Sequence, residues 1–394
     1  MKTEVVLFWV FLFIVFYTYI GYGVVLYCLV WIKDMLTKPV TNEILFEDLP
    51  EVTLLISAYN EEDIIDEKMY NTMALDYPPE KLKVIWITDG STDSTNLKLS
   101  KYENVKVLFE SERRGKTAAI NRAFPFVDSS ITIFTDANTL VNQEAVNEIV
   151  KAFSDSMVGC VAGEKRIAVK KRDIAVSGGE GIYWKYESFL KALDSRLNTT
   201  VGAAGELFAI RSDLFEPMGT DTLLDDFIMS MKIAQRGYKI AYCSDAYAIE
   251  TGSYSMLEEK KRKIRIAAGG IQSVYRLSNL LNIFRYPILS FQYVSHRVLR
   301  WTITPFLLFA LLPLNILIVL ADDSRIYIIL LILQSIFYLV AFLGLLYEDK
   351  KVRFKYFFIP HYFIFMNINV IRGIIYLIKK RKGDGTWERA RRGV

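Results

Sequence analysis

The 394-residue chain has few cysteines, and none of them belongs to a recognisable pair. Cys28, Cys160 and Cys243 are far apart, and no C-x-x-C occurs. We therefore expect neither a disulfide framework nor a zinc site, which fits a reducing, cytoplasmic setting for the polar part of the chain. The formal net charge is only +4, so no global basic field indicates nucleic acid as a partner.

The chain also lacks a phosphate-binding P-loop and any evident internal repeat. The segment RRGKTAAI contains a G-K-T that begins at Gly115, but a Walker A loop needs another glycine five positions earlier, where Glu110 stands. Only two histidines occur, His296 and His361, and we interpret both as structural.

Apolar residues, by contrast, are abundant. They make up 52% of the chain, the mean hydropathy is +0.22, and 23% of the residues are charged, a mixture that suggests a soluble domain joined to membrane segments. Residues 5–32 carry no charge over 28 positions, which is long enough for a transmembrane helix and too long for a signal peptide. Residues 302–320 and 326–347 predict two further spans.

Basic residues indicate on which side of the membrane the polar part lies. Lys33 and Lys38 follow the first span, and the segment EDKKVRFK at 348–355 follows the third. Because positive charge marks the cytoplasmic side, we expect a multi-pass protein of the cell membrane with residues 33 to about 283 in the cytoplasm. Residues 284–301 have the pattern of an interfacial helix that leads into the second span.

The last apolar stretch, residues 356–378, allows two interpretations. As a span it would place the basic tail outside, against the charge rule. It can instead lie in the membrane interface, or enter the membrane and return. Several of its residues are polar or disturb helices, namely Pro360, His361, Asn367, Asn369 and Arg372.

These patterns divide the chain into five expected parts. They begin with an N-terminal transmembrane helix at 1–35, a cytoplasmic domain at 50–255 and an amphipathic region at 256–301. C-terminal membrane helices follow at 302–378 (two, with a third span or an interfacial helix), and a basic tail covers 379–394.

Strand-like and helix-like segments alternate between residues 51 and 250. VTLLISAYN, KVIWITDGS, VKVLFE and ITIFTDAN predict strands, and helical patterns such as EEDIIDEKMYNTMAL and KTAAINRAFPFV separate them. Such alternation predicts βαβ units and a mostly parallel sheet, and therefore an α/β fold.

Polar residues follow three of the predicted strands. Asn60 and Glu61 come after the first strand, Asp89 after the second, and Asp136 and Asn138 after the fourth. Ligands of parallel sheets bind beyond the carboxyl ends of the strands. Three clusters at matching strand ends therefore favour a binding site over a set of simple turns.

Six motifs occur in the order found in the family 2 inverting glycosyltransferases, which the chain resembles over about residues 50 to 275. They are SAYNEE, TDGSTDST, RRGKTAAIN, TDAN, LLDDF and RKIRI. The resemblance is closest to the membrane-embedded synthases of cellulose, hyaluronan and poly-N-acetylglucosamine. It implies a hexosyltransferase that uses a UDP-sugar. The implied fold is the type A glycosyltransferase fold, a mostly parallel, Rossmann-like sheet, here flanked by transmembrane and interfacial helices.

The resemblance also implies where the nucleotide-sugar donor binds. Asp89 is similar to the acid that hydrogen-bonds the uracil, and Asn60 and Glu61 are similar to the pair that holds base and ribose. Lys116 would approach the nucleotide or its phosphates. The other expected donor-binding residues are Ala58, Ser91, Asp136, Arg262 and Arg265. For Ser91, a helix cap is the alternative role.

Asp136-Ala137-Asn138 resembles the D-x-D motif of the family, with an amide in the third place. Mg²⁺ or Mn²⁺, the cofactor that the resemblance implies, prefers hard oxygen ligands and bridges diphosphate oxygens. Asp136 would bind the ribose or the metal, and Asn138 supplies a neutral oxygen where many relatives have a carboxylate. A helix N-cap at either residue is the alternative.

Leu224-Asp225-Asp226-Phe227 resembles the T-E-D motif, whose final acid is the catalytic base, and the resemblance gives this role to Asp226. Two adjacent carboxylates raise one pKa by like-charge repulsion, which suits a base. Asp225 is then a positioning acid or a neighbour of the metal. A cap at the start of a helix is the alternative, and both roles can coexist.

RKIRIAAGG, at 262–270, resembles a degenerate Q-x-x-R-W motif, with Arg262 in place of Gln and Ile266 in place of Trp. Arg265 keeps the cation that would neutralise the leaving diphosphate, so we count it with the catalytic residues. RVLRW, at 297–301, matches R-x-x-R-W letter by letter, but it begins a membrane span, where Arg and Trp commonly anchor helices. We therefore favour Arg265.

VGAAGELFAIR, at 201–211, resembles the segment that lines the acceptor site of the family. It places Gly205, Glu206 and Leu207 near the end of the acceptor, and Trp184 can stack on sugar or on lipid. The alternatives are that GELFAI is a plain strand and that Trp184 is simply buried.

The resemblance thus implies a membrane-bound enzyme that moves a sugar from a UDP-sugar to a growing polysaccharide or a lipid-linked acceptor by metal-assisted in-line displacement. Membrane lipids are expected partners. Few spans are available for a channel, so processive export would need a homo-oligomer or a secretion partner, and single addition to a lipid acceptor is the alternative. A non-catalytic scaffold that binds a nucleotide sugar and a transporter are disfavoured, because the polar motifs gather in the cytoplasmic domain.

Overall fold

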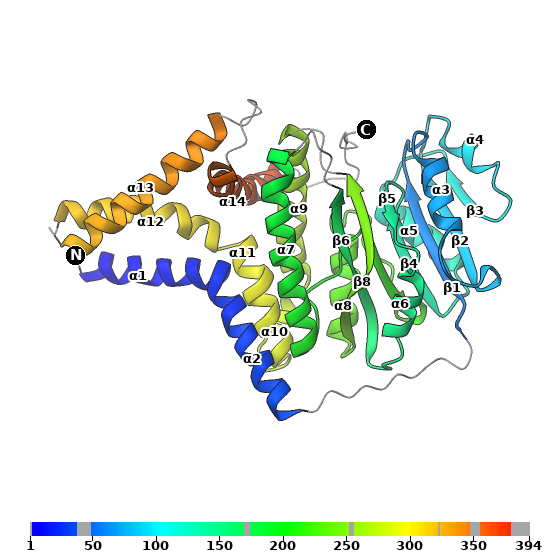
Figure 1. The fold of residues 1–394 in the computed structure, drawn as a ribbon, viewed down its shortest axis with the longest axis horizontal. Helices are drawn as coiled ribbons and strands as arrows, with labels where there is room; N and C mark the ends of the chain where they lie inside the picture. The colour runs from blue at the N-terminus through cyan, green and yellow to red at the C-terminus, as the bar shows by residue number, and fades with distance from the viewer. Residues whose placement is uncertain are drawn as a thin grey trace.

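The computed structural model describes residues 2–37, 49–168, 174–251, 256–321, 324–346 and 355–379. Its centre is an eight-stranded sheet in the order β3-β2-β1-β4-β7-β6-β8-β5 (Figure 1). The strands are β1 Val52–Ala58, β2 Leu82–Asp89, β3 Lys106–Glu110, β4 Ile131–Asp136, β5 Thr139–Val141, β6 Val158–Ala168, β7 Leu207–Arg211 and β8 Lys239–Thr251. The predicted α/β class is confirmed.

The first four strands of the sheet run parallel, so the strand ends that carry the predicted polar clusters meet at one edge. β1 pairs with β2 and with β4, and Ser57 lies opposite Asp136 in the second of these pairings. β6 and β8 are also parallel, whereas β7 runs antiparallel to β4 and β6. Leu207, at the start of β7, therefore lies opposite Thr135 near the carboxyl end of β4, and residues 201–206 reach the same edge.

Helices cover both faces of this sheet. One face carries α3 Ile65–Met73, α4 Thr95–Leu99 and α6 Ala145–Ala152, and the other carries α5 Lys116–Ala123 and α8 Asp225–Gln235. Two longer helices, α7 Ile174–Leu197 and α9 Met256–Arg276, lie between the sheet and the apolar helices (Figure 1).

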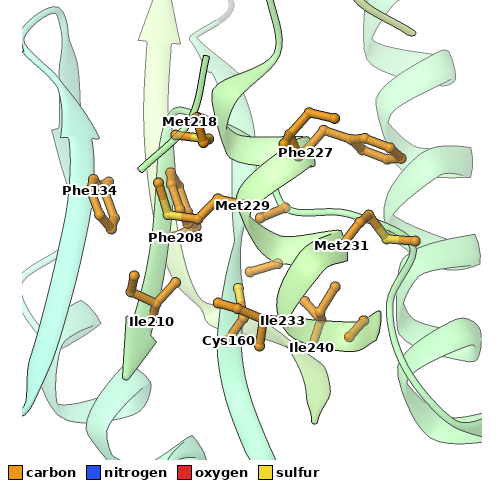
Figure 2. Close-up of a cluster of buried hydrophobic side chains, with 14 of the residues drawn as sticks. Phe134, Cys160, Phe208, Ile210, Met218, Phe227, Met229, Met231, Ile233 and Ile240 are labelled. Carbon is orange, nitrogen blue, oxygen red and sulfur yellow. The ribbon is translucent and has the colours of Figure 1, made fainter. Parts of the chain in front are cut away.

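The core on the α8 side anchors the segment that carries the predicted base. Phe134 of β4 stacks on Phe208 of β7 with ring centroids 4.6 Å apart. Met229 and Ile233 of α8 pack into the same cluster (Figure 2). Burial of each such side chain contributes roughly 1.5–3 kcal/mol, so the first turn of α8 is held in a fixed place relative to β4.

Within the described ranges, four helical stretches are long and apolar enough to cross a membrane: Lys2–Leu36, Thr304–Ala321, Arg325–Leu346 and Phe358–Lys379. Both spans predicted after residue 300 are found as helices, α12 Thr304–Ala321 and α13 Arg325–Leu346. The segment before them, predicted as an interfacial helix, forms α10 Pro287–Tyr293, a π-helical turn at Val294–Val298 and α11 Leu299–Trp301.

The N-terminal helix runs from Lys2 to Leu36 and is kinked near its middle. α1 Lys2–Phe16 and α2 Tyr22–Leu36 are joined by a π-helical turn, and α2 bends away from α1 in Figure 1. At the bend, the hydroxyl of Tyr186 in α7 donates to the carbonyl of Tyr19 at 2.8 Å. A side chain that hydrogen-bonds to the carbonyls of a helix is a common cause of such kinks. α2 then packs on α7 through Leu26 and Val30.

The helix whose interpretation the sequence leaves open is α14, Lys355–Lys379. In Figure 1 it is strongly foreshortened, whereas α1, α12 and α13 are seen from the side, so α14 crosses them. It packs against α9, where Gly373 allows close approach, since a Cβ at that position would come within 2.7 Å of the Cβ of Ala267.

Candidate active site

A cavity of about 1180 Å³ begins at the carboxyl edge of the sheet and extends to the apolar helices. Most of the predicted site residues line it. They are Ala58, Glu61, Asp89, Lys116, Asp136, Asn138, Trp184, Gly205, Glu206, Asp225, Asp226, Arg262 and Arg265. The sequence thus identifies one cleft from segments that lie more than 200 residues apart in the chain.

Asn60 and Ser91 lie next to this cavity but not among the described residues that line it. Asn60 adopts a left-handed conformation with φ of 53°, and its backbone N–H donates to the Ser91 hydroxyl at 3.1 Å. Its carboxamide oxygen accepts from the backbone N–H of Thr92 at 2.8 Å. The two residues therefore join the loops after β1 and β2, and they hold Glu61 at the rim of the cavity.

Leu207 is not placed as the resemblance implies. Its side chain is 2% exposed and belongs to the core on the α3 and α6 side of the sheet. The alternative interpretation, that GELFAI continues into a plain strand, holds for this residue because β7 begins here. Gly205 and Glu206, which precede the strand, remain in the cavity.

Asp89 organises the loop that presents Lys116. Its carboxylate accepts the backbone N–H groups of Arg114, at 3.1 and 3.2 Å, and of Gly115, at 2.7 Å. A carboxylate offers about four lone-pair sites, so Asp89 can still accept one more hydrogen bond from a ligand. The motifs TDGSTDST and RRGKTAAIN are therefore one structural unit, which their separation in sequence conceals.

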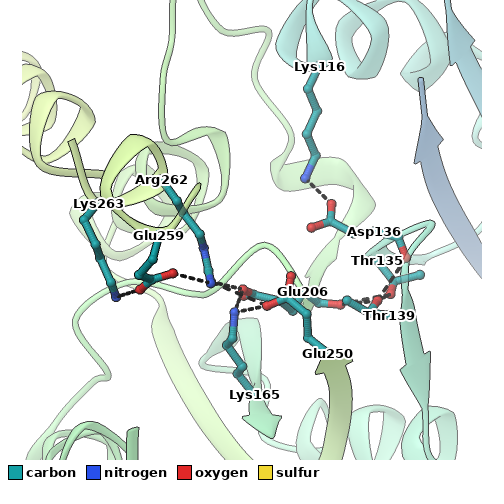
Figure 3. Close-up of polar contacts among 10 residues, drawn as sticks. All are labelled: Lys116, Thr135, Asp136, Thr139, Lys165, Glu206, Glu250, Glu259, Arg262 and Lys263. Atoms are coloured by element: carbon teal, nitrogen blue, oxygen red, sulfur yellow. Dashed lines mark hydrogen bonds and ion pairs between the residues drawn. The ribbon is translucent and has the colours of Figure 1, made fainter. Parts of the chain in front are cut away.

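Lys116 lies among three carboxylates on the cavity wall. Its Nζ is 2.7 Å from Oδ1 of Asp136 (Figure 3). It also lies 3.9 Å from Oδ2 of Asp225. Although burial lowers the pKa of Lys116, the charges of Asp136, Asp225 and Asp226 raise it above its usual value. The ammonium group is therefore protonated and offsets part of the negative charge at this edge of the sheet.

Asp226 is an acid of the cavity whose pKa is raised well above its usual value. Burial and the neighbouring charge of Asp225 raise its pKa to about 7, against the opposing effect of Lys116. Gly205 leaves room beside it, since a Cβ there would lie 3.4 Å from Oδ2 of Asp226. The N-cap position of α8 is Leu224, so neither acid has the capping role that the sequence allows.

Glu206 belongs to a chain of alternating charges that joins the sheet to α9 (Figure 3). It pairs with Lys165, which also pairs with Glu250, and Arg262 lies 3.5 Å from both glutamates. Although burial raises the pKa of Glu206, the Lys165 ammonium lowers it to about 2. Arg262 thus faces carboxylates in this structure. Trp184 is half-buried beside the same cluster, with its ring 5.0 Å from Lys165 Nζ.

The segment RVLRW, interpreted from the sequence as a membrane anchor, also lines the cavity. Arg297, Arg300 and Trp301 reach it from the π-helical turn before α11 and from α11 itself. Trp301 packs on Phe227, with ring centroids 5.1 Å apart. It also packs on Gly270 of α9, where any Cβ would come within 2.4 Å of its ring. The two candidate R-x-x-R segments therefore meet in one site, and the R-x-x-R-W match was the signal that could have found the second.

Comparison with known proteins identifies the class to which this cleft belongs. Residues 50–269 match the family described as glycosyltransferase like family 2, and the chain belongs to that family. The matched range includes all six motifs, so the resemblance drawn from them is confirmed.

Two curated relatives show which proteins the chain is similar to. The poly-beta-1,6-N-acetyl-D-glucosamine synthase of Staphylococcus aureus strain MSSA476 is 29% identical over 255 residues, which is 61% of this chain and 60% of that protein. The beta-monoglucosyldiacylglycerol synthase of Nostoc sp. strain PCC 7120 is 27% identical over 237 residues, 57% of this chain and 50% of that protein. The match thus spans less than two thirds of either relative.

A solved structure extends the likeness to nearly the whole chain. The mannosyltransferase PcManGT of Pyrobaculum calidifontis, in complex with GDP-Man and Mn²⁺, has a TM-score of 0.71 at 22% identity. The alignment covers 95% of this chain and 100% of that one. It confirms the fold class, a type A glycosyltransferase sheet flanked by helices, and the long apolar helices indicate association with a membrane.

Proposed function

We propose that the protein is a membrane-bound inverting glycosyltransferase that moves a sugar from a UDP-sugar to an acceptor hydroxyl. The observation that carries this proposal is the position of Asp226. A carboxyl group with a pKa raised to about 7 faces the same cavity as Lys116 and Asp136. A general base works best when its pKa lies near the working pH, so Asp226 is suited to take a proton from a hydroxyl.

The proposed step is a single in-line displacement. The hydroxyl oxygen of the acceptor bonds to the anomeric carbon from the face opposite the diphosphate. The bond from that carbon to the diphosphate oxygen breaks, and its electron pair leaves with the nucleoside diphosphate. The hydroxyl proton passes to the carboxylate of Asp226. Because attack and departure use opposite faces, the anomeric configuration inverts.

The donor would occupy the part of the cavity nearest the sheet. Glu61 and Asp89 would hold the nucleoside, while Ala58 at the end of β1 leaves space beside it. Lys116, and Arg265 from α9, would lie near the diphosphate and stabilise the charge that develops as it leaves. All five line the cavity.

A divalent ion, Mg²⁺ or Mn²⁺, fits the oxygen atoms on this side of the cavity. Asp136 and Asn138 both line it, and Oδ2 of Asp225 is buried without a hydrogen-bond partner among the described residues. Carboxylate and amide oxygens are the hard ligands that both ions prefer. In the described ranges no three His, Cys, Asp or Glu side chains form a metal site, so the ion would share its ligands between protein and donor. When bound, it would supply further charge stabilisation of the leaving diphosphate.

The arrangement of the apolar helices supports a multi-pass topology with the catalytic domain in the cytoplasm, attached to the cell membrane. In this proposal α1, α12 and α13 cross the bilayer, and α14 lies along its surface with α7 and α9. The foreshortening of α14 in Figure 1 and its packing on α9 support the interfacial role. An odd number of spans, with a cytoplasmic end to α13, then keeps the basic tail inside, as the charge rule requires.

The acceptor would be a glycan or a lipid-linked molecule that enters the cavity from the membrane side. The name of the staphylococcal relative indicates a polymer product and that of the cyanobacterial relative a glycolipid. Export of a polymer would require a second copy or a secretion partner, because three spans enclose little space.

A donor screen tests the proposed function. Purified full-length protein in nanodiscs with Mn²⁺ is offered UDP-glucose, UDP-galactose, UDP-N-acetylglucosamine and GDP-mannose, and the released nucleoside diphosphate is measured. We expect turnover of a UDP-sugar, its loss in Asp226→Asn, and normal turnover in Asp213→Asn, a change at an exposed acid. Turnover of GDP-mannose alone would exclude the UDP donor, and equal turnover by both variants would exclude Asp226 as the base.

A further inference from the structure

The cavity does not end at the catalytic acids but continues between the apolar helices. Its lining there comes from α1, α12, α13 and α14, and includes Phe16, Leu308, Phe337, Phe363, Met366 and Val370. A donor nucleotide needs no such surface. The extension therefore points to an acceptor with a hydrocarbon portion that lies among these helices.

Arg300 stands at the entrance to this apolar part. Arg300 is 9% exposed and lines the cavity. One Nη is 3.1 Å from Oε2 of Glu187, but Nε and the other Nη find no hydrogen-bond partner among the described residues. Leaving a buried donor unsatisfied costs about 1–3 kcal/mol, and more for a charged group. Two such donors on one guanidinium beside a cavity are placed to bind the acceptor oxygens of a ligand.

The charges around Arg300 specify an anion. Arg297, Arg300 and Lys191 line the cavity together with the anion Glu187, which pairs with both arginines. Glu187 already pairs with Arg297 and lies 3.2 Å from Nε2 of His296. A planar guanidinium with two parallel N–H groups binds phosphate oxygens in a bidentate way.

Contacts between neighbouring side chains give the order in which the groups lie between Asp226 and the apolar part of the cavity. Phe227, next to Asp226, touches the ring of Trp301 at 5.1 Å, and Trp301 immediately follows Arg300. The guanidinium of Arg300 lies 6.0 Å from the ring of Tyr19, which contacts Phe363 of α14 at 4.7 Å. From Asp226 toward the apolar helices, the cavity therefore presents a base, then an aromatic ring, then a cation and finally an apolar groove.

We propose that the acceptor is a lipid in which a phosphate joins a long hydrocarbon chain to a sugar. The sugar lies on Trp301 with a hydroxyl at Asp226, the phosphate binds Arg300, and the chain lies between α1, α12, α13 and α14. This inference rests on the proposed function, which supplies the donor and the base. A neutral glycolipid would add no negative charge where Glu187 is shared by Arg297 and Arg300, and a free polysaccharide would leave the apolar groove unused.

The test compares probes that differ in one group. Full-length protein carrying Asp226→Asn, which blocks turnover, is placed in phosphatidylcholine nanodiscs. Binding is measured for phytanyl-phosphate-linked glucose, for phytanyl glucoside and for glucose 1-phosphate. We expect the first to bind roughly tenfold or more tightly than the second, as a charge-assisted hydrogen bond implies. Glucose 1-phosphate, which has no chain, should bind more weakly than the first.

Substitutions of Arg300 and Arg285 test whether Arg300 binds the phosphate. Arg300→Gln should remove the difference between the two phytanyl probes, and Arg300→Lys should keep part of it because the charge remains. Arg285→Gln, at an exposed arginine of the same segment, should change nothing. Equal binding of the two phytanyl probes, an undiminished preference in Arg300→Gln, or equally tight binding of glucose 1-phosphate would overturn the proposal.

The probes also separate this inference from the proposed function. If the wild-type protein turns over no donor but prefers the phosphate-linked probe, the proposed function is wrong and the phosphate site stands. If it turns over a UDP-sugar but shows no preference between the phytanyl probes, the inference alone is wrong.

Discussion

Nζ of Lys116 lies 2.7 Å from Oδ1 of Asp136 and 3.9 Å from Oδ2 of Asp225, so one ammonium group joins the end of β4 to the first turn of α8. Asp226 is the next residue of that turn. The charge of Lys116 therefore acts on the proposed base as well as on the proposed metal ligand, and its removal has effects that can be measured separately.

Lys116→Gln should move the acid limb of the pH–rate profile to higher pH. Burial and Asp225 raise the pKa of Asp226 to about 7, and Lys116 opposes them. Without the ammonium the pKa rises further, and a base must be deprotonated to act. We expect kcat/KM at pH 7 to fall by about tenfold or more and to recover partly toward pH 9. Lys101→Gln, at an exposed lysine, is the control, and an unmoved limb in Lys116→Gln would contradict the account.

Asp225→Asn should move the same limb in the opposite direction. The charge of Asp225 is the second cause, after burial, that raises the pKa of Asp226. The neutral amide removes this repulsion at nearly constant volume, so the pKa of Asp226 should fall below about 7. The measurement is kcat/KM between pH 5 and pH 9. Loss of turnover over the whole pH range would show that Asp225, rather than Asp226, accepts the proton, and an unmoved limb would contradict the effect of Asp225 on the pKa of Asp226.

Asn138→Asp should strengthen the binding of the divalent ion. Asn138 offers a neutral oxygen in the cavity beside Asp136, and a carboxylate is a stronger ligand for Mg²⁺ and Mn²⁺. Chelation should abolish turnover in the wild-type protein, and titration with Mn²⁺ should restore it. In the variant the half-saturating Mn²⁺ concentration should be lower. Turnover that survives complete chelation would exclude the metal from the reaction.

Asp226→Asn should stabilise the folded protein at alkaline pH. The folded pKa of Asp226, about 7, lies above the ordinary value of 3.8, so the folded state loses stability as pH rises from about 4 through 7. The amide removes the cost of ionising a half-buried group next to Asp225. The variant should therefore have the higher Tm at pH 8, with a smaller difference at pH 5. The same Tm difference at both pH values would show that the pKa of Asp226 is not raised.

The strand-end part of the site was predictable from local patterns. Asp89 and Asp136 directly end apolar strands, and parallel pairing then brings them to one edge without further information. Asp225 and Asp226 required the resemblance, because a pair of acids before a helix also fits a cap. For Leu207 the sequence allowed both an acceptor-site residue and the start of a plain strand, and the resemblance favoured the first, whereas β7 begins here and the side chain is buried in the core.

The membrane side of the site could not be predicted in the same way. At the bend between α1 and α2, Tyr19 accepts a hydrogen bond from Tyr186, which lies 167 residues away in the chain. Arg300 and Trp301 read as a membrane anchor because nothing local shows that Gly270 opens a place for the indole ring on α9. Contacts between distant segments decide these positions, and hydropathy reports only that the segments are apolar.

The most direct test of the central claim separates chemistry from binding at Asp226. Turnover of the UDP-sugar and its dissociation constant are measured for wild-type protein and Asp226→Asn at pH 7.5 with saturating Mn²⁺. The account predicts a loss of kcat of at least about a thousandfold with donor affinity within about threefold of wild type. Retained turnover, or a loss that follows weaker donor binding alone, would contradict it.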